Sequence, residues 1–225
     1  MSRDWFGSIP IVDGLGFARG IMVLDDCEGT CTWVISGTGG DDVHEFAVAA
    51  AFQGTYGLRL ATRATGAAAD DYVQAVKVFG FPESGLLVAR VKIGSVDVSD
   101  VKTARLNLQW SNGVKGYSAS VHLMMSAGTA QYLNSAGTYT AIACLAQTFS
   151  DQAWYTLELA VDCIDNEYVG VFFNGTRVDL ADIDVYEAGA DTERGAKVGL
   201  AVYAVGANQA EIQVDNIYVG EFRDA

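Results

Sequence analysis

The sequence is poor in basic side chains, proline and histidine. Its 225 residues include 14 Lys and Arg against 28 Asp and Glu, 2 Pro and 2 His, and the formal net charge is −14 at pH 7. Nucleic-acid binding needs clustered Lys and Arg, and an anionic membrane surface repels a strongly acidic chain, so the composition argues against both partners. No run of about 18 apolar residues occurs, so no transmembrane helix is predicted.

The sequence also lacks the motifs of common catalytic and cofactor sites. It has no Gly-rich phosphate loop, dinucleotide fingerprint or EF-hand, and neither His44 nor His122 has a nucleophile-elbow motif beside it. Asp182 and Asp184 share one face of an extended segment, but Glu187 falls out of register because side chains alternate with period two. The carboxylate pair of a glycoside hydrolase is therefore missing, and we predict that the chain is not an enzyme.

The cysteines and the N-terminus indicate a reducing site of synthesis. Cys27 and Cys31 lie close together, whereas Cys144 and Cys163 are far apart, which is not the spacing of a zinc site. We predict that Cys144 and Cys163 are buried thiols on apolar strands. Asp4 interrupts the apolar N-terminal stretch, so we expect no signal peptide and synthesis in a cytoplasm.

What the sequence does have is alternation of apolar and polar residues. Half of the residues are hydrophobic and only 19% are charged, which is enough apolar mass for a sizeable core. Period-two alternation predicts half-buried strands at 86–93, 103–110, 155–162 and 211–215. About twelve to fifteen such strands predict an all-β fold, a two-sheet antiparallel sandwich.

Turn signals lie between these strands. Asn112-Gly113 and Asn174-Gly175 are typical of two-residue hairpin turns, which need positive φ at both central positions. Short helices are candidates at 45–52 and 179–187.

Residues 1–20 differ from the rest of the chain. Their glycines and apolar side chains show no strand periodicity, so we predict an extended N-terminal arm at 1–20 and one β-sandwich domain at 21–225. The arm either straps its own domain or reaches a neighbouring subunit. Its candidate contact residues are Trp5, Phe6, Ile9, Ile11 and Phe17.

Residues 116–150 contain no Asp, Glu, Lys or Arg. One interpretation is a central hairpin covered by the other sheet. The other is a contact surface, because interface cores lose charge and gain Tyr and Met. The candidate contact residues of this segment are Tyr117, Tyr132 and Tyr139.

Several segments together resemble the laminin-G/concanavalin A-like jelly-roll families. At 154–178 a Trp opens a strand that ends in Asp, and a hairpin with an Asn-Gly turn follows. Residues 23–29 with Trp33 are similar to the opening strand of these families, 56–60 to an inner strand, and 214–219 to the closing strand. The resemblance covers roughly residues 20–220 and implies a jelly-roll sandwich, a fold that hosts lectins, glycosidases, adhesion modules and virion proteins.

The same resemblance implies one candidate cofactor, a structural calcium. Jelly-roll binding modules often hold this ion between carboxylates of the first and last strands, and calcium takes six to eight oxygen ligands. Asp25, Asp26, Glu28 and Asp215 occupy the matching places. The alternative is that these carboxylates are only solvated.

Two function hypotheses follow. The first is a virion structural protein, a capsid decoration or cement protein that forms a homo-oligomer. It would bind a major capsid protein through its arm and its uncharged face, and its location would be the virion. The arm, the uncharged segment and the missing catalytic motif motivate this hypothesis, by analogy with phage decorating proteins.

The alternative hypothesis is a carbohydrate-binding, lectin-like module. Such sites stack sugar rings on exposed aromatic side chains beside Asn, Gln and Asp. The candidate stacking residues are Trp33 and Trp110, with Tyr117, Tyr132 and Tyr139 available to either hypothesis. The alternative for each of these rings is a place in the core.

Overall fold

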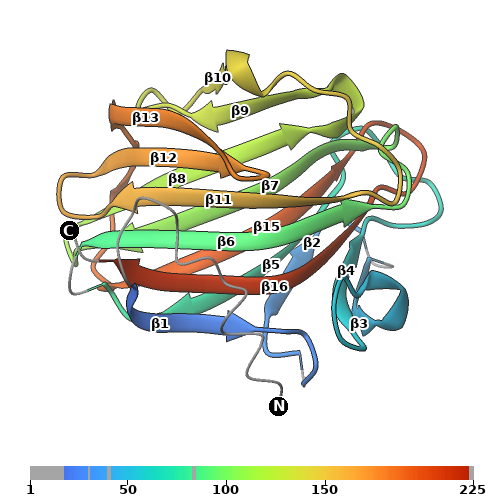
Figure 1. Cartoon of the computed structure of the whole chain (residues 1–225), viewed down its shortest axis with the longest axis horizontal. Helices are drawn as coiled ribbons and strands as arrows, with labels where there is room; N and C mark the ends of the chain where they lie inside the picture. Colours follow the sequence, from blue (N-terminus) through green and yellow to red (C-terminus); the bar gives the residue numbers. More distant parts are fainter. Residues whose placement is uncertain (1–17, 30, 40–41, 83–84, 223–225) are drawn as a thin grey trace.

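The chain folds into two antiparallel sheets packed face to face (Figure 1). The computed structural model describes residues 18–29, 31–39, 42–82 and 85–222. In these ranges each sheet has eight strands. No helix among them is long and apolar enough to cross a membrane.

The front sheet of Figure 1 has the order β13-β12-β11-β6-β16-β4-β3. Strand β1 pairs with the second half of β16, and β4 pairs with its first half. The bounds are β13 Thr176–Asp184, β12 Glu167–Phe173, β11 Trp154–Asp162, β6 Leu86–Ser95, β16 Glu211–Phe222, β4 Gly57–Ala61, β3 Val43–Ala47 and β1 Ala18–Asp25.

The back sheet has the order β10-β9-β8-β7-β15-β5-β2, and β14 pairs with the first residues of β8. The bounds are β10 Tyr139–Ala141, β9 Thr129–Leu133, β8 Lys115–Met124, β7 Val101–Ser111, β15 Gly195–Ala204, β5 Tyr72–Phe79, β2 Val34–Gly37 and β14 Tyr186–Ala190. Three short 3₁₀ turns complete the described elements: η1 Val48–Ala50, η2 Met125–Ala127 and η3 Ala143–Leu145.

The four strands predicted from alternation are confirmed as β6, β7, β11 and β16. Their apolar positions face the space between the sheets and form one buried cluster, to which β7 gives Leu106 and Leu108 and β11 gives Leu157 and Leu159. The predicted two-sheet antiparallel sandwich is therefore the observed fold.

The two Asn-Gly turns differ. Asn174 and Gly175 both have positive φ and connect β12 directly to β13, as a two-residue hairpin requires. At the other site only Gly113 is left-handed, and Ser111 pairs with Gly116 across a four-residue loop. The Asn112 side chain accepts hydrogen bonds from the backbone N–H groups of residues 114 and 115, which stabilises this longer turn instead.

Three local predictions were wrong. Residues 179–187 are not helical: β13 continues to Asp184, with Val178 and Leu180 buried at alternate positions, and β14 begins at Tyr186. At 45–52 the chain continues β3 and then forms only the 3₁₀ turn η1. Cys163 is buried as predicted, but Cys144 is exposed because it lies on η3, outside any strand.

The predicted N-terminal arm is described only at its end. Strand β1 begins at Ala18, so residues 18–20 belong to the sandwich rather than to the arm. The predicted contact residues Trp5, Phe6, Ile9, Ile11 and Phe17 lie outside the described residues.

One buried hydroxyl connects the two sheets. Tyr168 of β12 in the front sheet is almost completely buried. Its hydroxyl donates to the carbonyl oxygen of Leu133 on β9 at 2.7 Å and accepts from the backbone N–H of Ser120 on β8 at 3.0 Å. Burial raises the pKa of this phenol, so it stays protonated and able to donate.

We expect Tyr168→Phe to destabilise the fold by roughly 1–3 kcal/mol, because it leaves buried backbone groups of β8 and β9 without their partner. Urea unfolding with an unchanged m-value measures this loss. Tyr56→Phe, at an exposed position, is the matched control and should change stability by about 0.5 kcal/mol or less. Equal effects of the two substitutions would contradict the role of the cross-sheet hydrogen bond.

Candidate functional site

The outward face of the back sheet carries a polar row that crosses neighbouring strands. Because Ala104 and Leu106 point into the core, Arg105 between them points outward. In the strand register Arg105 lies opposite His122 on one side and opposite Ala201 on the other. The complete row, from β2 to β9, is Ser36, Gln74, Ala201, Arg105, His122 and Gln131.

Aromatic rings flank this row. Tyr72 and Tyr203 are directly paired across β5 and β15, with ring centroids 5.5 Å apart. At the other end the Tyr139 ring lies 3.9 Å from that of His122, and Tyr139 is 42% exposed. The Arg105 guanidinium lies over the Tyr203 ring at 5.3 Å, so one cation stands between two aromatic pairs.

A cavity of about 290 Å³ opens beside these rings. This volume is at the lower end of the range of pockets that hold small molecules, about 300–1,000 Å³. Its lining comes from β7, β8, β9, β10 and β15 and from the loop before β5: Asp70, Lys102, Thr103, His122, Met124, Gln131, Tyr139 and Tyr203.

Two nitrogen atoms in the row are buried without a hydrogen-bond partner among the described residues: Nε2 of His122 and Nε of Arg105. His122 is only 8% exposed, and burial, reinforced by the positive charge of Arg105, lowers its pKa to about 3. The imidazole is therefore neutral at pH 7. Arg105 donates from Nη2 to Oε1 of Gln74 at 2.9 Å.

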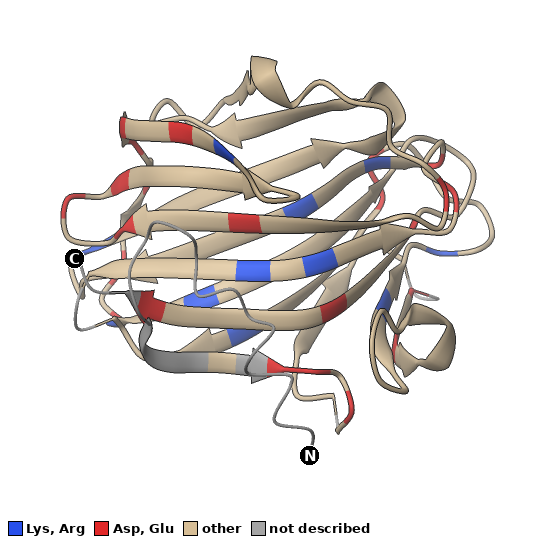
Figure 2. Ribbon diagram, in the orientation of Figure 1, with Lys and Arg blue, Asp and Glu red and all other residues tan. Residues whose placement is uncertain are grey.

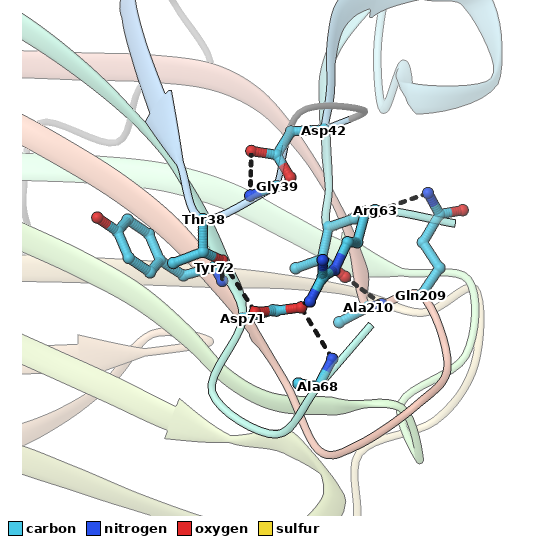
Figure 3. Close-up of polar contacts among 10 residues, drawn as sticks. Thr38, Gly39, Asp42, Arg63, Ala68, Asp71, Tyr72, Gln209 and Ala210 are labelled. Carbon is cyan, nitrogen blue, oxygen red and sulfur yellow. Dashed lines mark hydrogen bonds and ion pairs between the residues drawn. The ribbon is translucent and has the colours of Figure 1, made fainter. Parts of the chain in front are cut away.

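A polar cluster fixes the loop that leads into Tyr72 (Figure 3). Asp71 accepts hydrogen bonds from Nε of Arg63 at 2.8 Å, from the backbone N–H of Ala68 at 2.8 Å and from the hydroxyl of Thr38 at 3.1 Å. These hydrogen bonds lower the pKa of Asp71, and the one from the Ala68 backbone N–H contributes most. Since Thr38 also accepts from the backbone N–H of Tyr72, the first residue of β5 is held from two loops.

A second cavity, of about 340 Å³, lies at the opposite ends of the same strands. Its charged lining residues are Asp191, Glu193, Arg194 and Lys197, and Gln109 and Tyr117 also line it. Thr103 lines the first cavity and Gln109 the second, six residues apart along β7, which corresponds to about 20 Å. The two cavities therefore mark the ends of one stretch of the back sheet.

The two tryptophans predicted to stack sugars cannot do so. Trp33 is 6% exposed and donates from Nε1 to Asp25, and Trp110 is 2% exposed, donates to Asn166 and stacks on Tyr117. Both indole rings belong to the core cluster between the sheets. The prediction that they form a carbohydrate platform was wrong because the sandwich buries them.

The tyrosines of the charge-free segment have separate positions. Tyr132 is half-buried and packs edge-on against Tyr168. Both Tyr132 and Tyr117 contact the core cluster. Tyr139 points outward beside His122. Figure 2 shows that β9 and β10 carry no charged side chain, whereas acidic residues gather at loops and strand ends. The segment 116–150 therefore contributes both to the core and, through His122, Gln131 and Tyr139, to the outward face.

The four carboxylates predicted as calcium ligands are occupied by hydrogen-bond donors. Asp215 is fully buried and accepts from the backbone N–H groups of residues 52 and 53, both at 2.9 Å. Glu28 accepts from those of residues 55 and 56, and Asp26 from that of Glu28. Asp25 accepts from the Trp33 indole and from Lys77.

These bonds mean that the carboxylates anchor loops. A calcium ion would have to displace several donors, and the described residues contain no group of three or more Asp, Glu, His or Cys that could hold a metal ion. The geometry therefore gives the calcium prediction no support.

Sequence reasoning did not select Arg105, His122, Tyr203 and Tyr72 as site residues. Alternation within 103–110 already places Arg105 on the polar face of its strand, so that signal was available. Nothing local indicates that β15 and β5 would bring Tyr203 and Tyr72 beside it, because these contacts arise from pairing between distant segments.

Comparison with solved structures confirms the architecture. The protein titled "Cellulose induced protein, Cip1" superposes with a TM-score of 0.59 at 13% identity, over 90% of this chain and 99% of that one. A chain from a study of carbohydrate-binding modules of the β-sandwich superfamily gives a TM-score of 0.51 at 13% identity, over 89% and 62% of the two chains.

A sialidase also superposes, with a TM-score of 0.56 at 10% identity over 92% of this chain, which spans only 19% of the sialidase chain. No protein-family model matches the sequence, and no curated protein matches it. At these identities the likeness shows the jelly-roll β-sandwich fold alone.

The buried imidazole predicts a pH dependence of stability. The pKa of His122 is lower in the folded chain, about 3, than in the unfolded chain, about 6.5. Between these values the unfolded chain binds more protons, so acidification from pH 6.5 towards pH 3 destabilises the fold. His122→Gln should reduce the slope of the unfolding free energy by at most about 1.4 kcal/mol per pH unit in this window.

Urea unfolding at several pH values measures that slope. His44→Gln, at an exposed position on β3, controls for the general effect of the substitution. An identical slope for His122→Gln and wild type would show that His122 does not couple folding to protonation.

Proposed function

We propose that this chain is a glycan-binding module that binds through the outward face of the back sheet. The observation that carries the proposal is the arrangement of Tyr72, Tyr203, Tyr139 and His122 around Arg105, beside a cavity. Polar side chains alone would keep the outward face of a sheet compatible with water. Four rings gathered around one cation are not needed for that purpose.

The chemistry of a sugar matches this face. A pyranose ring has apolar C–H faces, which pack on the electron-rich faces of aromatic rings, and hydroxyl groups at its edge, which need donors and acceptors. The Tyr139–His122 and Tyr72–Tyr203 pairs offer ring faces, while Arg105 and amides such as Gln74 and Gln131 offer polar groups. The cavity lining is correspondingly mixed, with Tyr139, Tyr203 and Met124 beside polar residues such as His122 and Gln131.

The two cavities favour a chain of sugars over a single one. They lie on the same strands about 20 Å apart. Between them the outward positions of β15 are Gly199 and Ala201, the smallest residues available. Ala201 is fully covered and Arg105 reaches across it to Gln74, so a polymer that extends between the two cavities would contact Arg105 on its way.

The structural comparisons support this function over the virion hypothesis. One similar fold belongs to a study of carbohydrate-binding modules, and another is named as a cellulose-induced protein. None of the structures named above concerns a virion. The homo-oligomer, the capsid partner and the virion location stay predictions from sequence.

We propose binding without catalysis. Glycoside hydrolysis uses two carboxyl groups on either side of the scissile bond. Among the described residues that line the first cavity, only Asp70 has a carboxyl group, and it forms an ion pair with Lys102. Asp182 and Asp184 lie on β13 of the other sheet, and Glu187 forms an ion pair with Lys115.

Affinity electrophoresis and calorimetry against a panel of soluble polysaccharides test the function. We expect at least one polymer to bind. Tyr139→Ala and Tyr203→Ala should each weaken that binding by about two- to tenfold, because an aromatic contact contributes about 0.5–1.5 kcal/mol. Tyr56→Ala, at an exposed position elsewhere on the chain, is the matched control and should bind like wild type.

Two results would contradict the proposal. One is failure of the folded wild type to bind any polymer at millimolar sugar. The other is unchanged binding by both tyrosine variants, which would move the binding surface away from the back sheet.

A further inference from the structure

We propose that the glycan carries carboxylate groups, and that Arg105 binds one of them. This inference rests on the proposed function and names the ligand class of the same face: an acidic polysaccharide that contains uronic acid. Its argument is the charge, hydrogen bonding and position of Arg105.

Arg105 has no carboxylate partner in the part of the chain that the structure describes. Acidic residues outnumber basic ones by 28 to 14, and most of the described Lys and Arg side chains form ion pairs with carboxylates, while Lys92, Arg194 and Lys197, like Arg105, form none. The paired side chains are Arg59, Arg63, Lys77, Arg90, Lys102, Lys115 and Arg177. Arg105 instead contacts the neutral Gln74 amide and the Tyr203 ring.

The guanidinium also has an unused donor. Its Nε–H is buried and bonds to nothing among the described residues. A buried donor without an acceptor is unfavourable, and more so when it belongs to a charged group. A carboxylate supplies two acceptor oxygens in the plane that suits the guanidinium fork, with compensating charge.

The neighbour of Arg105 fits the same ligand. His122 is its direct cross-strand partner, is buried, and has Nε2 without a hydrogen-bond partner among the described residues. His122 lines the cavity, although its Nε2 atom is buried and a sugar hydroxyl would reach it only if the Tyr139 ring beside it moved. Two adjacent side chains thus hold buried, unpaired nitrogens at one place behind the face, one cationic and one neutral.

Around Arg105 lie a small residue and an acid that is already paired. Ala201 separates Gln74 from Arg105 in the row, and its methyl group lets the long Arg105 side chain lie across β15. Asp70, the carboxylate that lines the cavity, is already paired with Lys102. An incoming carboxylate therefore meets an uncompensated cation near the middle of the face.

Matched polymers test the inference. Polygalacturonate, alginate and hyaluronan are each compared by calorimetry with the same polymer after chemical reduction of its carboxyl groups to alcohols. We expect at least one carboxylated form to bind about tenfold or more tightly than its reduced form. That preference should shrink between 20 mM and 150 mM NaCl, roughly as the Debye length shortens.

Variants assign the preference to one side chain. Arg105→Gln should weaken binding of the carboxylated form more than that of the reduced form, so that the preference for the carboxylated form is lost. Arg105→Lys should keep part of it, because charge remains but the planar fork is lost. Arg177→Gln, an exposed arginine on β13 of the front sheet, is the matched control and should bind like wild type.

The outcomes separate this inference from the proposed function. If polymers bind but reduced and carboxylated forms bind equally, or if folded Arg105→Gln keeps the preference, the carboxylate assignment is wrong and glycan binding stands. Stronger binding of sulfated than carboxylated polymers would also overturn it. Failure of every polymer overturns the function itself. If Arg105→Gln does not fold, Arg105→Lys and the wild-type polymer pairs decide.

Discussion

Each strand of the sandwich must bury one face against the opposite sheet, and this burial is the constraint on which the structure and its candidate site depend. Side chains alternate along a strand, so choosing Leu106 and Leu108 for the core also fixes Arg105 and Asn107 on the outward face. The same rule on β8 and β15 sets His122 and Tyr203 outward. The aromatic and polar face is therefore held by the core behind it, and its side chains stand on a rigid sheet.

Several acidic side chains hold loops in place rather than forming a metal-binding or catalytic group. Asp71, Asp215 and Glu28 each accept several hydrogen bonds, from backbone N–H groups and from neighbouring side chains, and in this way hold loops at the ends of strands. Such bonds satisfy backbone donors that a loop leaves unpaired. They also explain why carboxylates that look like metal ligands in sequence do not form a metal-binding set in the described structure.

Against this excess of satisfied acids, the environment of Arg105 is unusual. Most of the described Lys and Arg side chains form ion pairs with carboxylates. Arg105 instead packs on the Tyr203 ring, and its buried Nε–H has no acceptor among the described residues. The charge-free segment 116–150 contributes to this environment, because His122 and Tyr139 bring polarity and ring surface without a competing charge. Absence of charge in that segment thus serves two purposes, a buried β8 face and an uncrowded outward face.

The sequence by itself determined the four strongly alternating strands β6, β7, β11 and β16, their inward and outward faces and the two-sheet class, because alternation and turn residues act over neighbouring positions. It also placed Arg105 on a polar face and Tyr139 among the candidate contacts. Only the tertiary structure decided that Trp33 and Trp110 are buried and that Tyr72, Tyr203 and Arg105 meet. Period two says which way a side chain points but not which strand lies beside it, and that choice comes from pairing between segments far apart in the chain.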